Sequence, residues 1–219
     1  SGIVLSTGNV SSGGNVINGA ILNEGELNWG TDSDLEAATG VNNLFNATAI
    51  QFDFVSVTNQ IQFNYILASE EYFANFPCLY SDGFAFLIRE AGTNNPWQNI
   101  ALVPGTTVPV NTSTVHDEIP GFCAAENQQF FDGYNMGDTN FNGRTEVLTA
   151  TAVVIPNVSY TIKLVIADQT DENYDSAVFI EGKSFNATVD LGEDITTCAS
   201  NVTIDANLQN STGTFSWLF

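Results

Sequence analysis

The sequence has very few positively charged side chains. Its 219 residues include four Lys and Arg against 25 Asp and Glu, so the formal net charge is -21 at pH 7. A field of this sign repels nucleic acid and anionic lipid, and we therefore expect neither as a partner. The surplus also destabilises a compact state unless salt or bound cations offset it. Either the charge keeps the protein soluble, or it serves to bind divalent cations.

Histidine and cysteine are also scarce. His116 is the one histidine and the three cysteines form no C-x-x-C pair, so we expect no zinc site. In an exported protein we expect Cys78 to pair with Cys123, which leaves Cys198 without a partner in this sequence. Reduced, buried thiols are the alternative. No G-x-S-x-G motif and no phosphate-binding glycine loop is present, and we do not expect an enzyme.

Long apolar runs and helical patterns are missing as well. No run is long enough to cross a bilayer, so we expect no direct insertion into a membrane. Only residues 33–40 ("SDLEAATG") resemble a helical turn, capped by Ser33 or Asp34 and ended by Gly40. Short alternating runs dominate instead, at 49–55, 60–68, 82–88, 99–105, 145–154, 159–168 and 175–182. They predict an all-β fold, an antiparallel β-sandwich or jelly roll with long acidic loops.

The pattern predicts a domain boundary near residue 187. Residues 1–187 form the predicted β-sandwich, and residues 188–219 begin a new β alternation that ends in "GTFSWLF". This second stretch resembles the opening strands of a truncated immunoglobulin-like module, with Trp217 at the place of its core Trp. A cut before the second cysteine of that module accounts for the odd Cys198. We expect further immunoglobulin-like modules in the parent chain.

Carboxylate and amide side chains are concentrated in four loops. Calcium takes about six to eight oxygen ligands in flexible geometry, and acidic loops supply such ligands readily. The candidate groups are Asp32 with Asp34; Glu70 with Glu71; Asp168, Asp171 and Asp175; and Asp138, Asn140 and Asn142. In each loop the alternative is that the side chains cap turns and face water.

The last of these groups has the sharpest pattern. Residues 138–143 ("DTNFNG") copy the first half of an EF-hand calcium loop. Thr149 stands where the EF-hand has its bidentate Glu, so a distant carboxylate such as Glu146 has to close the site. An Asn/Asp-rich turn that needs no metal is the alternative.

The adjacent glutamates carry the stronger electrostatic argument. Neighbours in an extended strand face opposite sides, so at most one of Glu70 and Glu71 lies on a buried face unless the backbone bends. With four basic side chains in the chain, clustered carboxylates generally lack a Lys or Arg partner. Burying them is costly unless they are protonated or bind metal. We therefore expect calcium as a cofactor, held by Glu70 or Glu71 with Asp32, Asp34 and the 168–175 loop.

Several ordered stretches resemble the choice-of-anchor L family of bacterial extracellular domains. They are "GIVLSTGNV" (2–10), "GTDSDL" (30–35), "LASEEY" (67–72), "SDGFAFLI" (81–88), "NIALVPGTTVPV" (99–110), "GRTEVLTA" (143–150) and "KLVIADQTDENYDSAVFIEGKSF" (163–185). The resemblance covers about residues 1–186. It implies a module of large secreted or surface-anchored proteins, common in the Bacteroidetes, with a role in adhesion. It implies neither a defined ligand nor an enzyme.

A shorter stretch, "SDGFAFLI", is similar to the Ala-Asp-Gly-Phe-Ala-Phe stretch of L-type lectins, in which the Asp binds a sugar beside calcium. The similarity places Asp82, with the adjacent Gly83, at a ligand. Separately, Tyr80 and Tyr134 lie in or beside predicted loops, where their rings can stack on a sugar. We expect a calcium-stabilised, secreted or cell-surface module that binds a cell-surface glycan or protein. An architectural spacer that binds only metal is the first alternative. A carbohydrate-active enzyme that uses Glu70 and Asp175 is the second.

Overall fold

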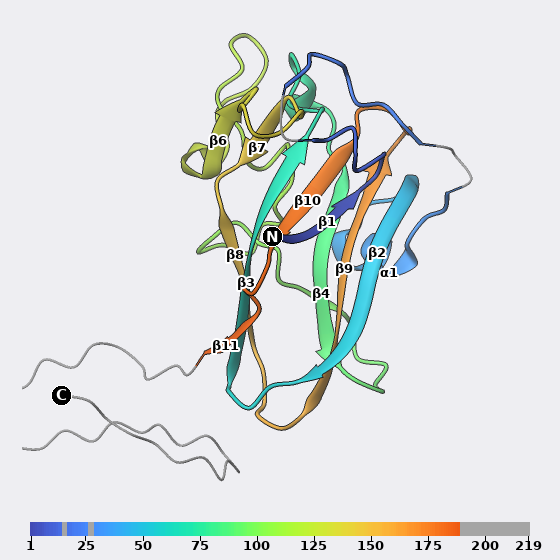
Figure 1. Ribbon diagram of the computed structural model, residues 1–219, viewed down its shortest axis with the longest axis vertical. Coiled ribbons are helices and arrows are strands. Elements are labelled where there is room, and N and C mark those ends of the chain that lie inside the picture. Colours follow the sequence, from blue (N-terminus) through green and yellow to red (C-terminus); the bar gives the residue numbers. More distant parts are fainter. Residues whose placement is uncertain (15–16, 26–28, 189–219) are drawn as a thin grey trace, which may run out of the picture.

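The chain folds into two antiparallel β-sheets that pack face to face (Figure 1). This arrangement is seen in a computed structural model, which describes residues 1–14, 17–25 and 29–188. The first sheet has the order β1 (Gly2–Ser6), β10 (Ser176–Glu181), β3 (Gln60–Ser69), β7 (Gly143–Thr145) and β6 (Phe131–Tyr134), and β8 (Leu148–Val153) and β11 (Asn186–Thr188) also pair with β3. The second sheet has the order β2 (Leu44–Val55), β9 (Ser159–Gln169), β4 (Gly83–Glu90) and β5 (Gln98–Asn99). The predicted all-β sandwich is confirmed.

The main core lies between the two sheets. From Ile61 to Leu67 of β3, buried side chains that face the core alternate with less buried ones. Phe63 of this set meets Phe86 of β4 with their ring centroids 4.7 Å apart. Rings of this size bury enough apolar surface to dominate the energy of a sandwich core.

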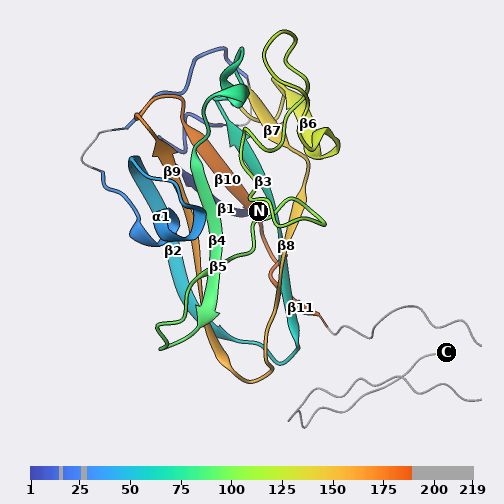
Figure 2. The ribbon, with the colours of Figure 1, turned by 180° about the vertical axis from the view of Figure 1, so that it is seen from behind.

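Helix α1 (Ser33–Thr39) covers the outer face of the second sheet, as the reverse view shows (Figure 2). Leu35, fully buried, packs there against residues of β4 and β9. The helix is capped by Asp32, whose carboxylate accepts the N–H groups of Asp34 and Leu35 at 3.1 and 3.0 Å. The predicted cap at Ser33 or Asp34 was therefore wrong by one or two residues, while Gly40 ends the helix with φ 75° as predicted.

The outer face of the first sheet is covered near its upper end by the residues that follow β1, 7–14 and 17–25, which we call the N-terminal segment. Its Leu22 packs with Ala68, Phe141 and Ala177 in a small apolar cluster. In Figure 1 this dark blue segment passes over the upper end of the sandwich. Side chains near that end are therefore buried on both faces of the sheet.

The predicted strand at 99–105 is mostly absent. Only Gln98–Asn99 pair with β4, and residues 101–110 form a loop in which Leu102 bridges Pro109. Proline lacks the N–H that a sheet ladder needs, and this stretch contains Pro104 and Pro109. Nearly all of the other predicted runs lie in strands.

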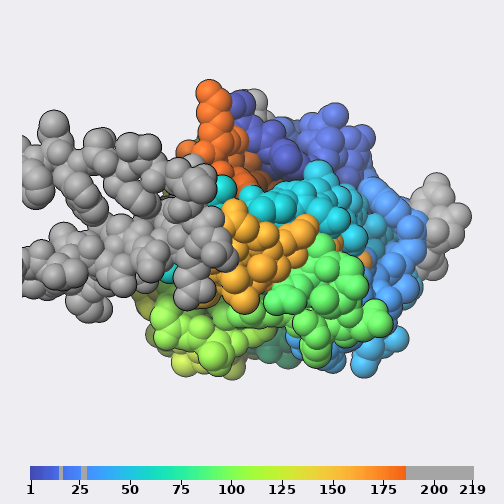
Figure 3. Space-filling view, turned by 90° about the horizontal axis from the view of Figure 1, so that it is seen from below, coloured from blue at the N-terminus to red at the C-terminus, as the bar shows by residue number. Residues whose placement is uncertain are grey.

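The end of the sandwich opposite the N-terminal segment is formed by short connections. Figure 3 shows this end, where the β2–β3, β8–β9 and β4–β5 connections lie close together. Among the described residues no helix is long and apolar enough to cross a membrane. Residues 189–219, which carry the predicted immunoglobulin-like module and Cys198, lie outside the described part of the chain.

Candidate functional site

Five carboxylates are buried at the upper end of the sandwich in Figure 1, where β3 and β9 end and β4 and β10 begin. The register of both sheets brings them there, because Ser69 pairs with Ser176 and Gly83 pairs with Ala167. None of the five is more than 7 % exposed. They are Glu70, Glu71, Asp82, Asp168 and Asp175, and we call them the acidic end cluster.

Three members of this cluster lie close enough to interact directly. The Glu71 carboxylate accepts the N–H of Asp82 at 2.9 Å and the hydroxyl of Thr112 at 3.2 Å. Asp82 in turn accepts the N–H of Gln169 at 3.2 Å and the hydroxyl of Ser176. Burial, followed by the charges of Glu71 and Asp168, raises the pKa of Asp82 well above its usual value.

The other two members lie under the N-terminal segment. Glu70 donates its N–H to the carbonyl of Asp175 at 3.0 Å, which holds the two residues side by side. Both Asp175 carboxylate oxygens accept the N–H of Glu24, at 3.1 and 3.0 Å. Strand β3 ends at Ser69, so the backbone bends there and both glutamates are buried, at 1 % and 5 % exposure. The sequence analysis expected at most one buried glutamate unless the backbone bends, and this bend allows both to be buried.

Several buried oxygens at this end have no hydrogen-bond partner. These are both carboxylate oxygens of Glu70, one of Asp168, and the side-chain oxygen of Asn46. The N–H groups of Leu22 and Asn142 lie near enough to Glu70 to lower its pKa somewhat, but neither reaches hydrogen-bond geometry. An unpaired buried carboxylate costs several kcal/mol, roughly, when ionised. No sequence pattern indicated a role for Asn46 at this end. Its side-chain amide donates a hydrogen bond to the Asp168 carboxylate at 2.8 Å, and its backbone is in the left-handed conformation (φ 52°).

The basic side chains that form ion pairs do so with aspartates outside the acidic end cluster. All four ion pairs in the described part of the chain involve Arg144 or Lys163. Burial is the main reason why the pKa rises to about 7 for Glu70 and to about 6 for Asp175. Burial likewise raises the pKa values of Glu71 and Asp168. The cluster is therefore a set of buried acids without cationic partners among the described side chains.

Two of the predicted calcium groups have cationic partners. Asp32 and Asp34 contact the Lys163 ammonium at 2.6 and 2.7 Å, next to the start of α1. Their bonds are to Lys163 and to the helix, and no contact joins them to Glu70 or Glu71 in the described residues. Asp138 pairs with Arg144, which also contacts Asp132.

The remaining predicted ligands have structural contacts. Asn140 accepts the N–H of Asn18 at 2.9 Å, and Asn142 donates to the backbone carbonyl of Glu70 at 3.0 Å. Both thus attach the 138–143 loop to the acidic end of the sandwich. Asp171 is exposed and caps its own turn through the N–H of Asn173 at 2.9 Å. Among the described residues, no group of three or more Asp, Glu, His or Cys side chains is arranged to hold a metal.

A polar groove lies beside the cluster. One depression of about 190 Å³ is lined by Asp82, Gly83 and Asn111, among others, and an adjoining one of about 290 Å³ is lined by Tyr80. Both depressions share the residues Ser81, Ser113 and Gln169, and we call them together the Ser81 groove. Tyr134 lies apart from it, in β6, where its ring packs on Phe131 at 4.8 Å.

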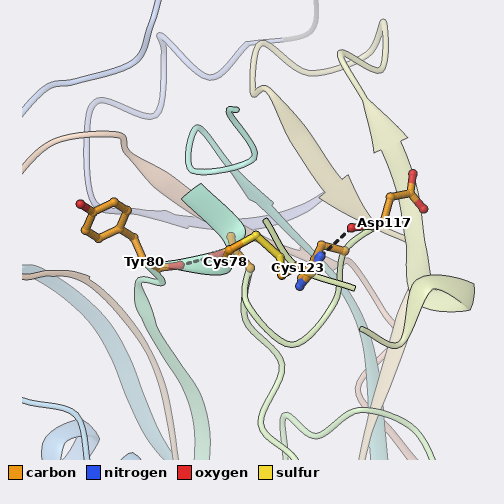
Figure 4. Close-up of a disulfide and its surroundings, with 6 residues drawn as sticks. Cys78, Tyr80, Asp117 and Cys123 are labelled. Atoms are coloured by element: carbon orange, nitrogen blue, oxygen red, sulfur yellow. Dashed lines mark hydrogen bonds between the residues drawn. A yellow bond between two sulfur atoms is a disulfide. The ribbon is translucent and has the colours of Figure 1, made fainter. Parts of the chain in front are cut away.

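A disulfide braces this groove. Cys78 is bonded to Cys123, as predicted, and closes a separation of 45 residues (Figure 4). Cys78 lies in a short 3₁₀ helix, Phe76–Cys78, that leads directly into Tyr80. The bond fixes this turn to the long connection between β5 and β6, which contains a second 3₁₀ helix, Gln128–Phe130. The pairing indicates an oxidising compartment.

The fold and this end of it define a disulfide-braced β-sandwich whose loops enclose unpaired acid groups. A model of the Choice-of-anchor L domain family matches residues 1–186, and the chain belongs to this family. Membership indicates a bacterial, surface-associated module. No curated protein and no solved structure is detectably similar to the chain.

Proposed function

We propose that this domain is a calcium-stabilised extracellular module that binds a glycan or a protein through the loops at its acidic end. The observation that carries the proposal is the position of Asp82. It belongs to the buried acidic end cluster, and it also lines the Ser81 groove. Whatever neutralises the cluster therefore also fixes the floor of the groove.

The lining of the groove favours a neutral, hydroxyl-rich ligand such as a sugar. Ser81, Asn111, Ser113 and Gln169 offer hydroxyl and amide groups, and no Lys or Arg lines either depression. The ring of Tyr80 is 46 % exposed at the rim and offers a flat apolar face for stacking. A ligand with polar edges and apolar faces fits this combination.

This proposal gives Asp82 a different role from the direct ligand contact that the sequence led us to expect. Both of its carboxylate oxygens already accept hydrogen bonds from within the chain. We therefore assign Asp82 to the floor of the groove, where it orders the 80–83 turn. The direct ligand contacts are assigned to Tyr80, Ser81 and Ser113.

Glycan-array binding with and without calcium tests this function. Tyr80→Ala is expected to lower binding to any glycan that the native protein retains, because it removes the exposed ring. Tyr134→Ala is the matched control, since that ring is similarly exposed, at 42 %, but lies outside the groove. Equal loss in both variants contradicts the groove assignment.

The two alternatives predict different results in the same experiments. If no glycan or protein partner binds in either condition, the domain is better described as an architectural spacer. Release of products from polysaccharides would support a carbohydrate-active enzyme instead. In that case Glu70 and Asp175 are the pair to mutate, although both lie beneath the N-terminal segment.

A further inference from the structure

We propose that a calcium ion binds between Glu70 and Asp175 and ties the N-terminal segment to the end of the sandwich. This inference rests on the calcium part of the proposed function and assigns its position. It does not depend on the identity of any ligand in the Ser81 groove. It also replaces the broader grouping expected from the sequence, in which Asp32 and Asp34 joined the same ion.

The first argument is the state of the Glu70 carboxylate. The residue is 1 % exposed, and neither carboxylate oxygen has a hydrogen-bond partner. Its backbone N–H donates to the carbonyl of Asp175 at 3.0 Å, so a second buried acid lies directly beside it. Water does not solvate these groups from outside, because Leu22 and its neighbours cover them. A bound cation gives the Glu70 carboxylate a partner and supplies the positive charge that neither acid receives from a described Lys or Arg.

The second argument is the supply of further oxygens. The Leu22 carbonyl accepts the N–H of Asp175 at 3.0 Å, which places a backbone oxygen of the N-terminal segment at this position. The Glu24 carbonyl lies next to Gly8, where an added Cβ would collide with the Asp175 carboxylate. Calcium accepts such mixtures of carboxylates, backbone carbonyls and water, whereas magnesium demands near-ideal octahedral geometry. A site with two carboxylates also agrees with the absence of any ready-made group of three acidic side chains among the described residues.

The third argument is the distribution of the basic residues. No Lys or Arg in the described residues forms an ion pair with Glu70 or Asp175: Lys163 binds Asp32 and Asp34, and Arg144 binds Asp132 and Asp138. No described ion pair includes a member of the acidic end cluster. The deficit of positive charge is therefore local, and a divalent cation can correct it there.

Calcium titration by calorimetry and by thermal melting tests the assignment. The metal-free protein is compared with Glu70→Gln, Asp175→Asn and the control Asp138→Asn, whose side chain is 70 % exposed in the native protein. We expect Glu70→Gln and Asp175→Asn each to weaken calcium binding at least about tenfold, and Asp138→Asn to leave it unchanged. Magnesium at the same concentration is expected to bind more weakly in every case.

The change in melting temperature caused by Glu70→Gln should reverse its sign when calcium is added, and this reversal distinguishes a calcium ligand from a merely structural residue. Without calcium, Glu70→Gln removes a buried charge and is expected to melt above the native protein. With saturating calcium, the same variant is expected to melt below it. A folded Glu70→Gln variant that melts below the native protein both with and without calcium shows that Glu70 is only structural, and this result overturns the assignment.

Three further outcomes also overturn it: no calcium binding at all, native affinity in Glu70→Gln, or loss of binding in Asp168→Asn alone. The last outcome places the ion at Asp168 and Asn46, where two other buried oxygens lack partners. If no glycan on the array binds but calcium binding is normal, only the ligand-binding function is overturned. The two proposals can therefore fail separately.

Discussion

The stability of the metal-free protein should fall as the pH rises from 5 to 7.5, and calcium should remove most of this fall. The pKa of Glu70 is raised from 4.5 to about 7, and that of Asp175 from 3.8 to about 6, mainly because both are buried. A carboxylate with a raised pKa holds its proton more tightly in the folded state than in the unfolded chain. Its contribution is therefore fully present below its unfolded pKa, and it is lost as the pH passes through the folded pKa.

The size of the effect follows from these pKa values. For Glu70 the difference corresponds to about 3 kcal/mol of unfolding free energy, and for Asp175 it is of similar size. Because the two groups interact, about 3 kcal/mol is a safer expectation for the pair than the sum. For a domain of this length, that amount lowers the melting temperature by about 6–12 °C. Calcium at about a hundred times its dissociation constant restores about 2.7 kcal/mol.

Melting curves recorded by circular dichroism at pH 5.0, 6.0, 7.0 and 7.5, on dialysed protein with and without calcium, give the required comparison. The curves should nearly coincide at pH 5.0, where protons neutralise the cluster, and separate progressively above pH 6. The surface charge of the whole chain also lowers stability at high pH, so Glu70→Gln serves as the control and should show a smaller fall. A metal-free melting temperature that is constant or rises over this range contradicts the reasoning.

Three further changes test the supports of the site by chemical denaturation. The double variant Cys78→Ser/Cys123→Ser should lose up to about 4 kcal/mol, the loop-closure value for a separation of 45 residues, and any groove ligand should bind more weakly. Gly8→Ala should cost about 1–3 kcal/mol and weaken calcium binding, because the new methyl group would displace a buried carboxylate. Lys163→Met should cost about 1–2 kcal/mol by leaving two aspartates unpaired, whereas Lys183→Met, at an exposed position, should be neutral.

Much of the framework was predictable from the sequence because it depends on local patterns. The alternation along 60–68 and 159–168 gave strands β3 and β9 within a residue or two, since a half-buried strand needs a period of two. The pairing of Cys78 with Cys123, expected for an exported protein with Cys198 assigned to the second module, is confirmed. The strand predicted at 99–105 was mostly wrong, because its apolar residues lie in a loop.

The composition of the acidic end could be predicted only in part. Glu70 and the 168–175 loop were grouped correctly at one end of the sandwich, since they follow strands that run the same way. Asp32 and Asp34 were expected there too, but their partner is Lys163, a residue of β9 whose relation to α1 depends on tertiary packing. The position of the N-terminal segment over Glu70 could not be predicted from the sequence either. It is made by an irregular segment whose sequence has no periodicity to reveal where it packs.

The placement of the basic residues favours one of the two explanations for the large negative charge. If the charge served only for solubility, the carboxylates would lie in water, and burial of five of them would gain nothing. Instead Lys163 and Arg144 compensate aspartates whose side chains are between 13 % and 70 % exposed, while Glu70, at 1 % exposure, has no hydrogen-bond partner for either carboxylate oxygen. A chain that keeps an uncompensated acid beneath a covering segment gains stability only from something that arrives with positive charge. The calcium ion that we propose between Glu70 and Asp175 would meet this need: it would order the N-terminal segment and, because the charge of Asp175 acts on Asp168, also the floor of the groove.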